Sequence, residues 1–222
     1  MKTNKTIFIL VILLSAFTSW SQGFVNLSFD NSKLTNLVIS GFPTTVAIVT
    51  GWSVNTVNPA TGDNNTLPYN DSYLDGAGSS LEGTNNPYGP STIQGKYSVY
   101  MQGGTVFAQN TTNGASIWQT GTIPVSSLSL TYWGGPLTVS FGGQALAFGI
   151  IGNGSGYAVW GADISAYAGQ TGELRFTVPW QSNVLLDNIQ FSSTAVPEPG
   201  TQALAALGGL LFGLRSWKKL SP

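Results

Sequence analysis

The six residues Ser127-Leu128-Ser129-Leu130-Thr131-Tyr132 alternate strictly between small polar side chains and larger apolar ones. A period of two is typical of a β-strand with one buried face. Gly134-Gly135-Pro136, Gly142-Gly143 and Gly152-Asn153-Gly154 predict tight turns just after it. Similar apolar runs between turn residues continue in both directions and predict strands at 24–29, 46–50, 97–101, 115–119, 125–132, 137–141, 144–151, 157–160, 173–178 and 184–192. About eight to ten short strands at this spacing predict an all-β, antiparallel two-sheet sandwich.

Residues 55–90 break this pattern, because Asn, Gly, Pro, Tyr and Asp follow one another there without a stable period. We therefore predict a long loop. Loops of this length in a compact domain are more often functional than decorative, so the segment is a candidate site. Its carboxylates are suitable calcium ligands, but they lack EF-hand spacing, and solvated turn residues are the favoured interpretation.

Composition excludes several kinds of chemistry. The 222 residues contain no cysteine and no histidine, which removes disulfides, thiolate metal sites and the Ser-His-Asp triad. Between Gln22 and Val196 three Lys or Arg residues face eight Asp or Glu residues, so this part carries a net charge of −5. An acidic domain lacks the electrostatic footprint of a nucleic-acid binder, and we expect no nucleic-acid partner.

The first 21 residues have the layout of a secretory signal peptide. Lys2 and Lys5 form a charged start, residues 7–17 are apolar, and Ser19 and Ser21 are the small residues that precede cleavage. We predict removal of residues 1–21 by signal peptidase, with cleavage after Gly23 as the alternative. An uncleaved membrane anchor is disfavoured because the apolar run is shorter than the roughly 20 residues that a bilayer helix needs.

The C-terminal end has three parts: the motif Val196-Pro197-Glu198-Pro199, an uncharged stretch over residues 200–214, and a basic tail at 215–222 that contains Arg215, Lys218 and Lys219. The stretch is short for a membrane-spanning helix, at about 22 Å for 15 residues. The motif, stretch and tail in this order resemble the PEP-CTERM sorting signal. The resemblance implies a single transmembrane helix and removal of the tail by an exosortase-type membrane peptidase, and the basic tail predicts a cytoplasmic end.

The last third resembles carbohydrate-binding jelly rolls of the galactose-binding type. The matching residues are Asp163–Gln170, Leu174-Arg175-Phe176 and Leu186–Phe191, and Val25–Asp30 with Gly51-Trp52-Ser53 match the opening of such domains. The resemblance implies a jelly-roll form of the sandwich.

Together with the two terminal segments, this gives three parts: a signal peptide at 1–21, one ectodomain at 22–195 and a sorting signal at 196–222.

Asp187 is the residue for which we predict a metal. It interrupts the otherwise apolar stretch Leu185–Ile189, and a buried unpaired carboxylate is costly. In the jelly rolls that this chain resembles, such an Asp joins oxygens from the N-terminal region around a cation, which implies a calcium site of Asp187 with Asp30. The alternative is that strand alternation turns Asp187 outward to solvent.

Aromatic residues suggest where a sugar would bind. Tyr73 and Tyr88 lie in the long loop and are predicted to be exposed, so they are the candidate ligand-binding residues. Core packing is favoured for Trp residues beside predicted strands. These are Trp52, Trp118, Trp133, Trp160 and Trp180.

Two classes of function remain. The first is an exported, surface-anchored or secreted protein without catalytic activity, which associates with extracellular polysaccharide. It would pass through an inner-membrane-anchored precursor to the cell surface or matrix. The second is a glycoside hydrolase or lyase, which needs paired carboxylates from Asp163, Glu173, Asp187 or the acidic loop. We favour the first, because the ectodomain has only two Glu residues and neither lies in a recognisable catalytic motif.

Overall fold

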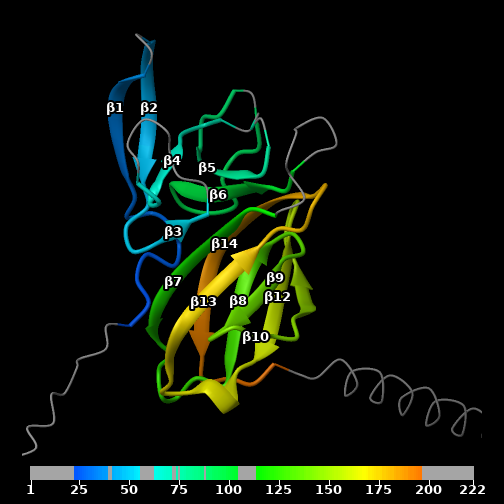
Figure 1. Ribbon diagram of the computed structural model, residues 1–222. Helices are drawn as coiled ribbons and strands as arrows, with labels where there is room; N and C mark the ends of the chain where they lie inside the picture. Colours follow the sequence, from blue (N-terminus) through cyan, green and yellow to red (C-terminus); the bar gives the residue numbers. More distant parts are fainter. Residues whose placement is uncertain are drawn as a thin grey trace, which may run out of the picture.

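The computed structural model describes residues 23–39, 42–55, 63–71, 74, 76–87, 89–104 and 114–196. These residues form antiparallel β-sheets and a single 3₁₀ turn, η1 (Ser165–Tyr167), and contain no α-helix (Figure 1). The all-β prediction is therefore confirmed for this part of the chain. The predicted signal helix at 1–21 and transmembrane helix at 200–214 lie outside the described residues.

Two sheets enclose the core. The larger has the strand order β11-β12-β8-β14-β6-β5, and the smaller has the order β10-β9-β13-β7-β3. The larger sheet consists of β5 (Gly78–Gly83), β6 (Tyr97–Gln102), β8 (Ser129–Gly134), β11 (Gly149–Asn153), β12 (Ala158–Asp163) and β14 (Asn183–Ser192). The smaller consists of β3 (Ser53–Val54), β7 (Ser116–Thr122), β9 (Thr138–Phe141), β10 (Gln144–Ala145) and β13 (Thr171–Thr177).

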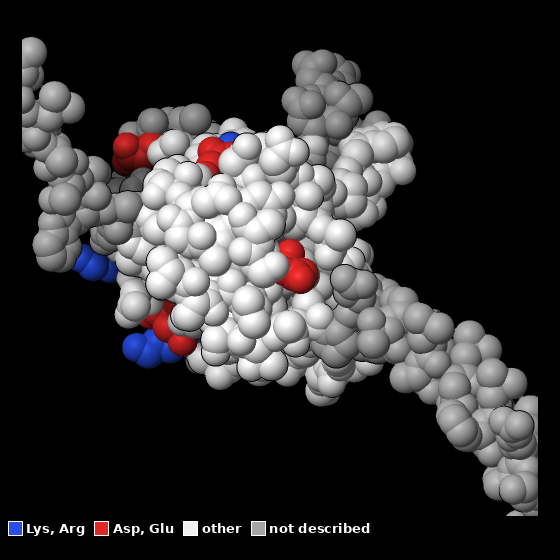
Figure 2. All heavy atoms as spheres, turned by 90° about the horizontal axis from the view of Figure 1, so that it is seen from below, with Lys and Arg blue, Asp and Glu red and all other residues white. Residues whose placement is uncertain are grey.

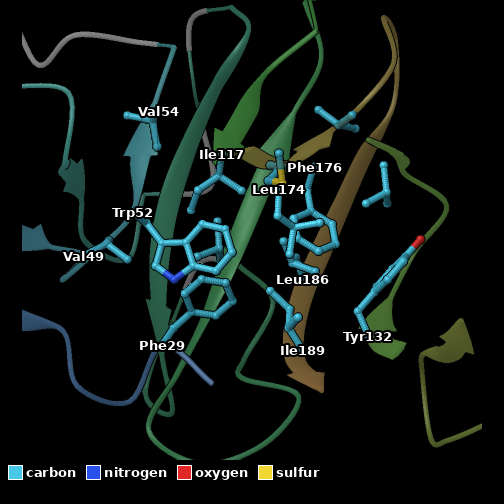
Figure 3. Close-up of a cluster of buried hydrophobic side chains, with 14 of the residues drawn as sticks. Phe29, Val49, Trp52, Val54, Ile117, Tyr132, Leu174, Phe176, Leu186 and Ile189 are labelled. Carbon is cyan, nitrogen blue, oxygen red and sulfur yellow. The ribbon is translucent and has the colours of Figure 1, made fainter. Parts of the chain in front are cut away.

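The core is a single cluster fed by both sheets (Figure 3). Phe176 of β13 lies between two aromatic neighbours, with its ring centroid 5.6 Å from that of Tyr132 on β8 and 6.1 Å from that of Trp52, which precedes β3. All three side chains are almost fully buried. Burying one large apolar side chain stabilises the fold by about 1.5–3 kcal/mol relative to leaving it in water, so this cluster holds the sheets face to face.

Eight strands pair in a nested order. Strand β6 pairs with β14, β7 with β13, β8 with β12, and β9 with β10, and every pair is antiparallel. This order is that of a long hairpin rolled around the core. The strands β6, β7, β8 and β9 form one arm of the hairpin, and β10, β12, β13 and β14 form the other. The ladder between β14 and β8 shifts between Asp187 and Gln190, a β-bulge that matters for the site described below.

The described part of the N-terminal segment, residues 23–96, adjoins the roll at one edge of each sheet. Its strands β3 and β5 extend the edges of the two sheets, next to β7 and β6. A third sheet of order β1-β2-β4 lies outside them and contains β1 (Lys33–Ile39), β2 (Phe42–Ile48) and β4 (Thr66–Pro68). Figure 1 shows the β1–β2 hairpin standing clear of the sandwich.

The predicted strand at 24–29 is wrong. Asn26 and Phe29 have left-handed backbone angles (φ 51° and 60°), which turn the chain instead of extending it. The reason is tertiary. Phe29 packs against Trp52 at 5.5 Å, and the Trp52 Nε1–H donates to the Asn26 carbonyl at 3.1 Å.

The predicted long loop is also wrong in part, because β4 and β5 lie within residues 55–90. Strand β5, of sequence Gly-Ser-Ser-Leu-Glu-Gly, shows no alternation of polar and apolar residues, yet all six residues are buried. Turns cover the face opposite the core: Asp71 N donates to Ser80 Oγ, and Gln102 Nε2 donates to the Leu74 carbonyl. A strand buried on both faces has no reason to alternate.

The opening hexapeptide forms its strand later than predicted. Leu130 and Tyr132 lie in the core as expected, but β8 begins at Ser129, and Leu128 is exposed. Ser129 is also buried, and the hydrogen bond that its hydroxyl donates to the Thr194 carbonyl at 2.7 Å compensates for this burial.

Candidate functional site: the turn held by two aspartates

The carboxylates of Asp30 and Asp187 bind the same turn, residues 93–97, from two distant parts of the chain. Asp30 follows the buried Phe29 turn, and Asp187 lies in β14 at the bulge. The turn joins the N-terminal segment to β6, so the two aspartates fix the junction between the segment and the roll. The two residues named for a calcium site thus contact the same turn, and the calcium site itself stays a prediction.

Asp187 is only 1% exposed, although it points away from the core. Its Oδ2 accepts from Ser98 Oγ at 2.8 Å and Gln94 N at 3.0 Å, and its Oδ1 accepts from Asn188 N at 2.6 Å. Burial raises the pKa of Asp187 to about 6, against these hydrogen bonds, which lower it; the nearby Asp30 charge raises it further. The residue therefore lies on the outward face of β14, but the turn over it keeps it from solvent.

Asp30 holds the other side of the turn. Its Oδ1 accepts from Lys96 N at 2.6 Å and from Tyr97 N at 3.2 Å. Gly95 allows this approach, because it has φ +65° and an added Cβ would lie 2.3 Å from Asp30 Oδ2. The sequence analysis missed Gln94, Gly95 and Ser98, and the one signal that indicated them was the turn dipeptide Gln94-Gly95.

Calcium takes six to eight oxygen ligands. In the described residues no group of three or more acidic, His or Cys side chains surrounds a common point. Both oxygens of Asp187 already accept hydrogen bonds, and Asp30 Oδ1 accepts two. These bonds supply the compensation for which a cation was invoked, so the described contacts do not require calcium, and its binding stays a prediction.

A second buried carboxylate, Glu82, lies in the same row of the sheet. Glu82 of β5 is opposite Ser98 of β6, and Ser98 contacts Asp187 of β14. The backbones at Glu82 and Asp187 are thus separated by two strand spacings, about 10 Å. Glu82 has 0% exposure, Asn86 donates to its Oε2, and burial raises its pKa. Both carboxylates are therefore buried beneath the turns that cover this face of the sheet.

The other two carboxylates named for catalysis have structural partners. Asp163, the last residue of β12, accepts at Oδ1 from N of Ser165, the first residue of η1, at 2.8 Å, and this backbone hydrogen bond lowers the pKa of Asp163. Glu173 forms an ion pair with Arg175 at 2.7 Å, and the Arg175 guanidinium lies 3.9 Å from the centre of the Trp118 ring. The two carboxylates lie on different sheets, in β12 and β13.

The tryptophans divide into three groups. Core packing is confirmed for Trp52, which is 1% exposed, and it is wrong for Trp180, which is 45% exposed. Trp118, Trp133 and Trp160 are half-buried. Trp180 belongs to the turn between β13 and β14, where Pro179 precedes it and ends the strand pattern. Tyr73 and Tyr88 lie outside the described residues.

The predicted sorting motif begins at the last described residue, Val196. Val196, four residues after β14, is half-buried and packs on β12, where a Cβ added to Gly161 would lie 2.8 Å from Val196 Cγ1. Pro197, Glu198, Pro199, Arg215, Lys218 and Lys219 lie outside the described residues. Within the described part of the chain, no helix is long and apolar enough to cross a membrane.

No protein-family model, curated protein or solved structure matches this chain. The resemblances of the tail and of the last third therefore stay predictions.

Proposed function

We propose that this chain is an exported, surface-anchored or secreted, non-enzymatic protein that associates with extracellular polysaccharide after processing by an exosortase-like peptidase. The observation that carries the proposal is how five of the seven described carboxylates are used. Asp30 and Asp187 hold a turn, Glu82 is buried, Asp163 accepts a hydrogen bond from the first residue of η1, and Glu173 pairs with Arg175. Glycoside hydrolysis needs two carboxyl groups flanking an accessible bond. Four of these five bind backbone N–H groups or Arg175, and Glu82 is fully buried.

The topology supports a jelly roll as the fold. The nested pairs β6–β14, β7–β13, β8–β12 and β9–β10 divide between two facing sheets, as the rolled hairpin of a jelly roll requires. Jelly rolls serve lectins and other sugar-binding modules, so this fold is compatible with a binder, although a fold alone does not fix a function.

The surface supports a neutral ligand. Charged residues are sparse on the face drawn in Figure 2, where most of the described atoms belong to uncharged residues. Neutral sugars are recognised by aromatic faces together with polar groups. Trp180 is the described tryptophan with an exposed side chain, and we add it to Tyr73 and Tyr88 as a candidate contact.

A polysaccharide screen tests the proposal. Protein recovered from cells that express the full chain is passed over immobilised polysaccharides, and reducing ends are measured in parallel. Retention without release of reducing ends is expected, and Trp180→Ala, Tyr73→Ala or Tyr88→Ala is expected to weaken retention. Val125→Ala is the matched control, because Val125 is 84% exposed on an unrelated turn. Release of reducing ends would instead favour the hydrolase or lyase.

Processing is tested by the intact mass of the protein at the cell surface. We expect a chain that starts near Gln22 and ends near Pro197 to Pro199. A surface form that retains Trp217 would contradict removal of the tail. Replacing Arg215, Lys218 and Lys219 by Glu is expected to disturb membrane orientation, because positive residues favour the cytoplasmic side.

Calcium bound by Asp30 and Asp187 is the remaining part of the proposal. A ligand that binds only the folded state raises the midpoint of thermal unfolding. We expect a higher midpoint with calcium than with chelator, and no difference in an Asp187→Asn, Asp30→Asn double variant. Equal midpoints for the parent would remove calcium and leave the hydrogen bonds as the full account of both aspartates.

A further inference from the structure

The β1–β2 hairpin is an arm that carries a single charged residue and has one open strand edge. Between Lys33 and Ile48 the sequence has one charged residue, Lys33. Strand β1 pairs with β2 and lies at the end of the sheet order β1-β2-β4, so its second edge has no strand beside it among the described residues. Figure 1 shows this arm projecting from the sandwich.

Strand pairing determines which backbone groups face the open edge. Val38 of β1 is opposite Pro43 of β2, and proline has no N–H to donate. Opposed residues in an antiparallel ladder alternate between pairs that exchange hydrogen bonds and pairs that do not. The Val38–Pro43 pair therefore does not exchange backbone hydrogen bonds. The same holds for the pairs formed by Asn36 and Leu34, which lie two and four residues before Val38. The N–H and C=O groups of Leu34, Asn36 and Val38 consequently point to the open edge.

A side-chain contact agrees with this parity. Thr45 Oγ1 donates to Asn36 Oδ1 at 2.9 Å, and these residues are directly opposite each other. Side chains come closer in pairs that do not exchange backbone hydrogen bonds.

Strand β1 lacks the features that keep an open edge from pairing. It contains no proline, no glycine and no bulge, and its register with β2 is continuous over seven pairs. Leu34 is 40% exposed and Val38 is 76% exposed. The single charge lies at the first residue of the strand, so the rest of the edge is uncharged.

We propose that two copies of this chain join by antiparallel pairing of β1 with β1, centred on Asn36. Leu34 of each copy then lies opposite Val38 of the other, so the two exposed apolar residues cover each other twice. The pairing is two-fold symmetric, as isologous dimer interfaces are. The two Lys33 residues are six positions apart along the pair, about 20 Å, which is beyond the reach of repulsion at physiological salt.

The absence of native cysteine allows a direct test, because a single introduced thiol has only its copy as partner. In the proposed pairing the two Asn36 Cα atoms are about 5.5 Å apart, within the range of a disulfide. The two Thr35 Cα atoms are displaced by two residues, about 8 Å or more, which is outside that range. Protein from cells that express the full chain is oxidised mildly as Asn36→Cys and as Thr35→Cys.

We expect a disulfide-linked dimer for Asn36→Cys and little for Thr35→Cys. Sedimentation of the parent should show a reversible dimer, with a dissociation constant raised at least tenfold by Val38→Lys and unchanged by Val125→Lys. A parent that sediments as a monomer at all concentrations would overturn the proposal. Equal or greater linking of Thr35→Cys would overturn it too, as would an arm that captures an extended peptide while the chain stays monomeric.

Discussion

The roll from Tyr97 to Ser192 and the segment from Gly23 to Lys96 are built on different principles. In the roll, one face of each strand is buried and the sequence pattern records it. Leu130 and Tyr132 are buried while Thr131 and Trp133 are less so, and each strand from β6 to β14 overlaps a predicted one. In the segment, β5 is buried on both faces and residues 24–32 are a turn. Sequence periodicity locates a strand when one of its faces is buried and the other is exposed. It fails for a strand such as β5, whose outer face is covered by turns.

The two regions nevertheless share one core and one polar junction. Trp52 and Phe29 of the segment pack with Phe176 and Ile189 of the roll (Figure 3). On the outer face, Asp30 and Asp187 bind the same turn from either region. The comparison therefore predicts a segment that lacks its own pattern but unfolds together with the roll.

The largest expected effect tests this shared core. Trp52→Ala in the segment and Phe176→Ala in the roll should each lower the free energy of unfolding by about 3–5 kcal/mol, because both remove a buried aromatic side chain. Both variants should unfold in a single transition, which is the same when measured by near-UV and by far-UV circular dichroism. Two transitions for Trp52→Ala would mean that the segment folds separately. Val125→Ala, on an exposed turn, is the control.

The pH dependence of stability tests the polar junction. The pKa of Asp187 is about 6 in the folded protein and near 3.9 when unfolded, so the folded state binds more protons between these values. Asp187 therefore contributes stability that is present below about pH 4 and lost as the pH rises through 6. The free energy of unfolding of the parent, relative to Asp187→Asn, should rise by at most about 3 kcal/mol from pH 7 to pH 4.

The comparison with Asp187→Asn cancels the titration of the other carboxylates. Denaturant titrations in the presence of chelator at each pH measure it. A difference that is flat with pH, or that falls as the pH is lowered, would contradict the raised pKa. Bound calcium would favour the charged form of Asp187 and make the difference fall as the pH is lowered. The measurement is therefore repeated with calcium.

A smaller effect is expected from the glycine of the same turn. Gly95→Ala places a Cβ against the Asp30 carboxylate at a positive φ, and should cost about 1–3 kcal/mol. Gly142→Ala is the matched control in the roll, since Gly142 has φ +55° with no atom within 4 Å of an added Cβ. Its cost should be about 1 kcal/mol, from the backbone alone. If the two substitutions lower the free energy of unfolding equally in thermal or denaturant unfolding, the Asp30 side chain moves aside without an energetic penalty.

The smallest effect is expected at Trp180. Trp180→Ala should change the free energy of unfolding by less than about 0.5–1 kcal/mol, because the side chain is 45% exposed in a turn. The contrast with Trp52→Ala measures how far burial separates two tryptophans that both lie beside strands. A loss of 3 kcal/mol or more on denaturant unfolding would place Trp180 in the packed structure and remove it from the candidate glycan contacts.

The sequence by itself determined the all-β class and the strands of the roll, because alternation and turn glycines act within a few residues. It also singled out Asp187, since a buried carboxylate in an apolar strand needs a partner, while Asp30 was named only from the resemblance to jelly rolls. Tertiary structure alone decided what that partner is: the backbone N–H groups of residues 94, 96 and 97 bind the two aspartates. It also decided that Phe29 turns inward and that β5 is a strand. Those outcomes depend on groups distant in sequence, whose positions no local pattern records.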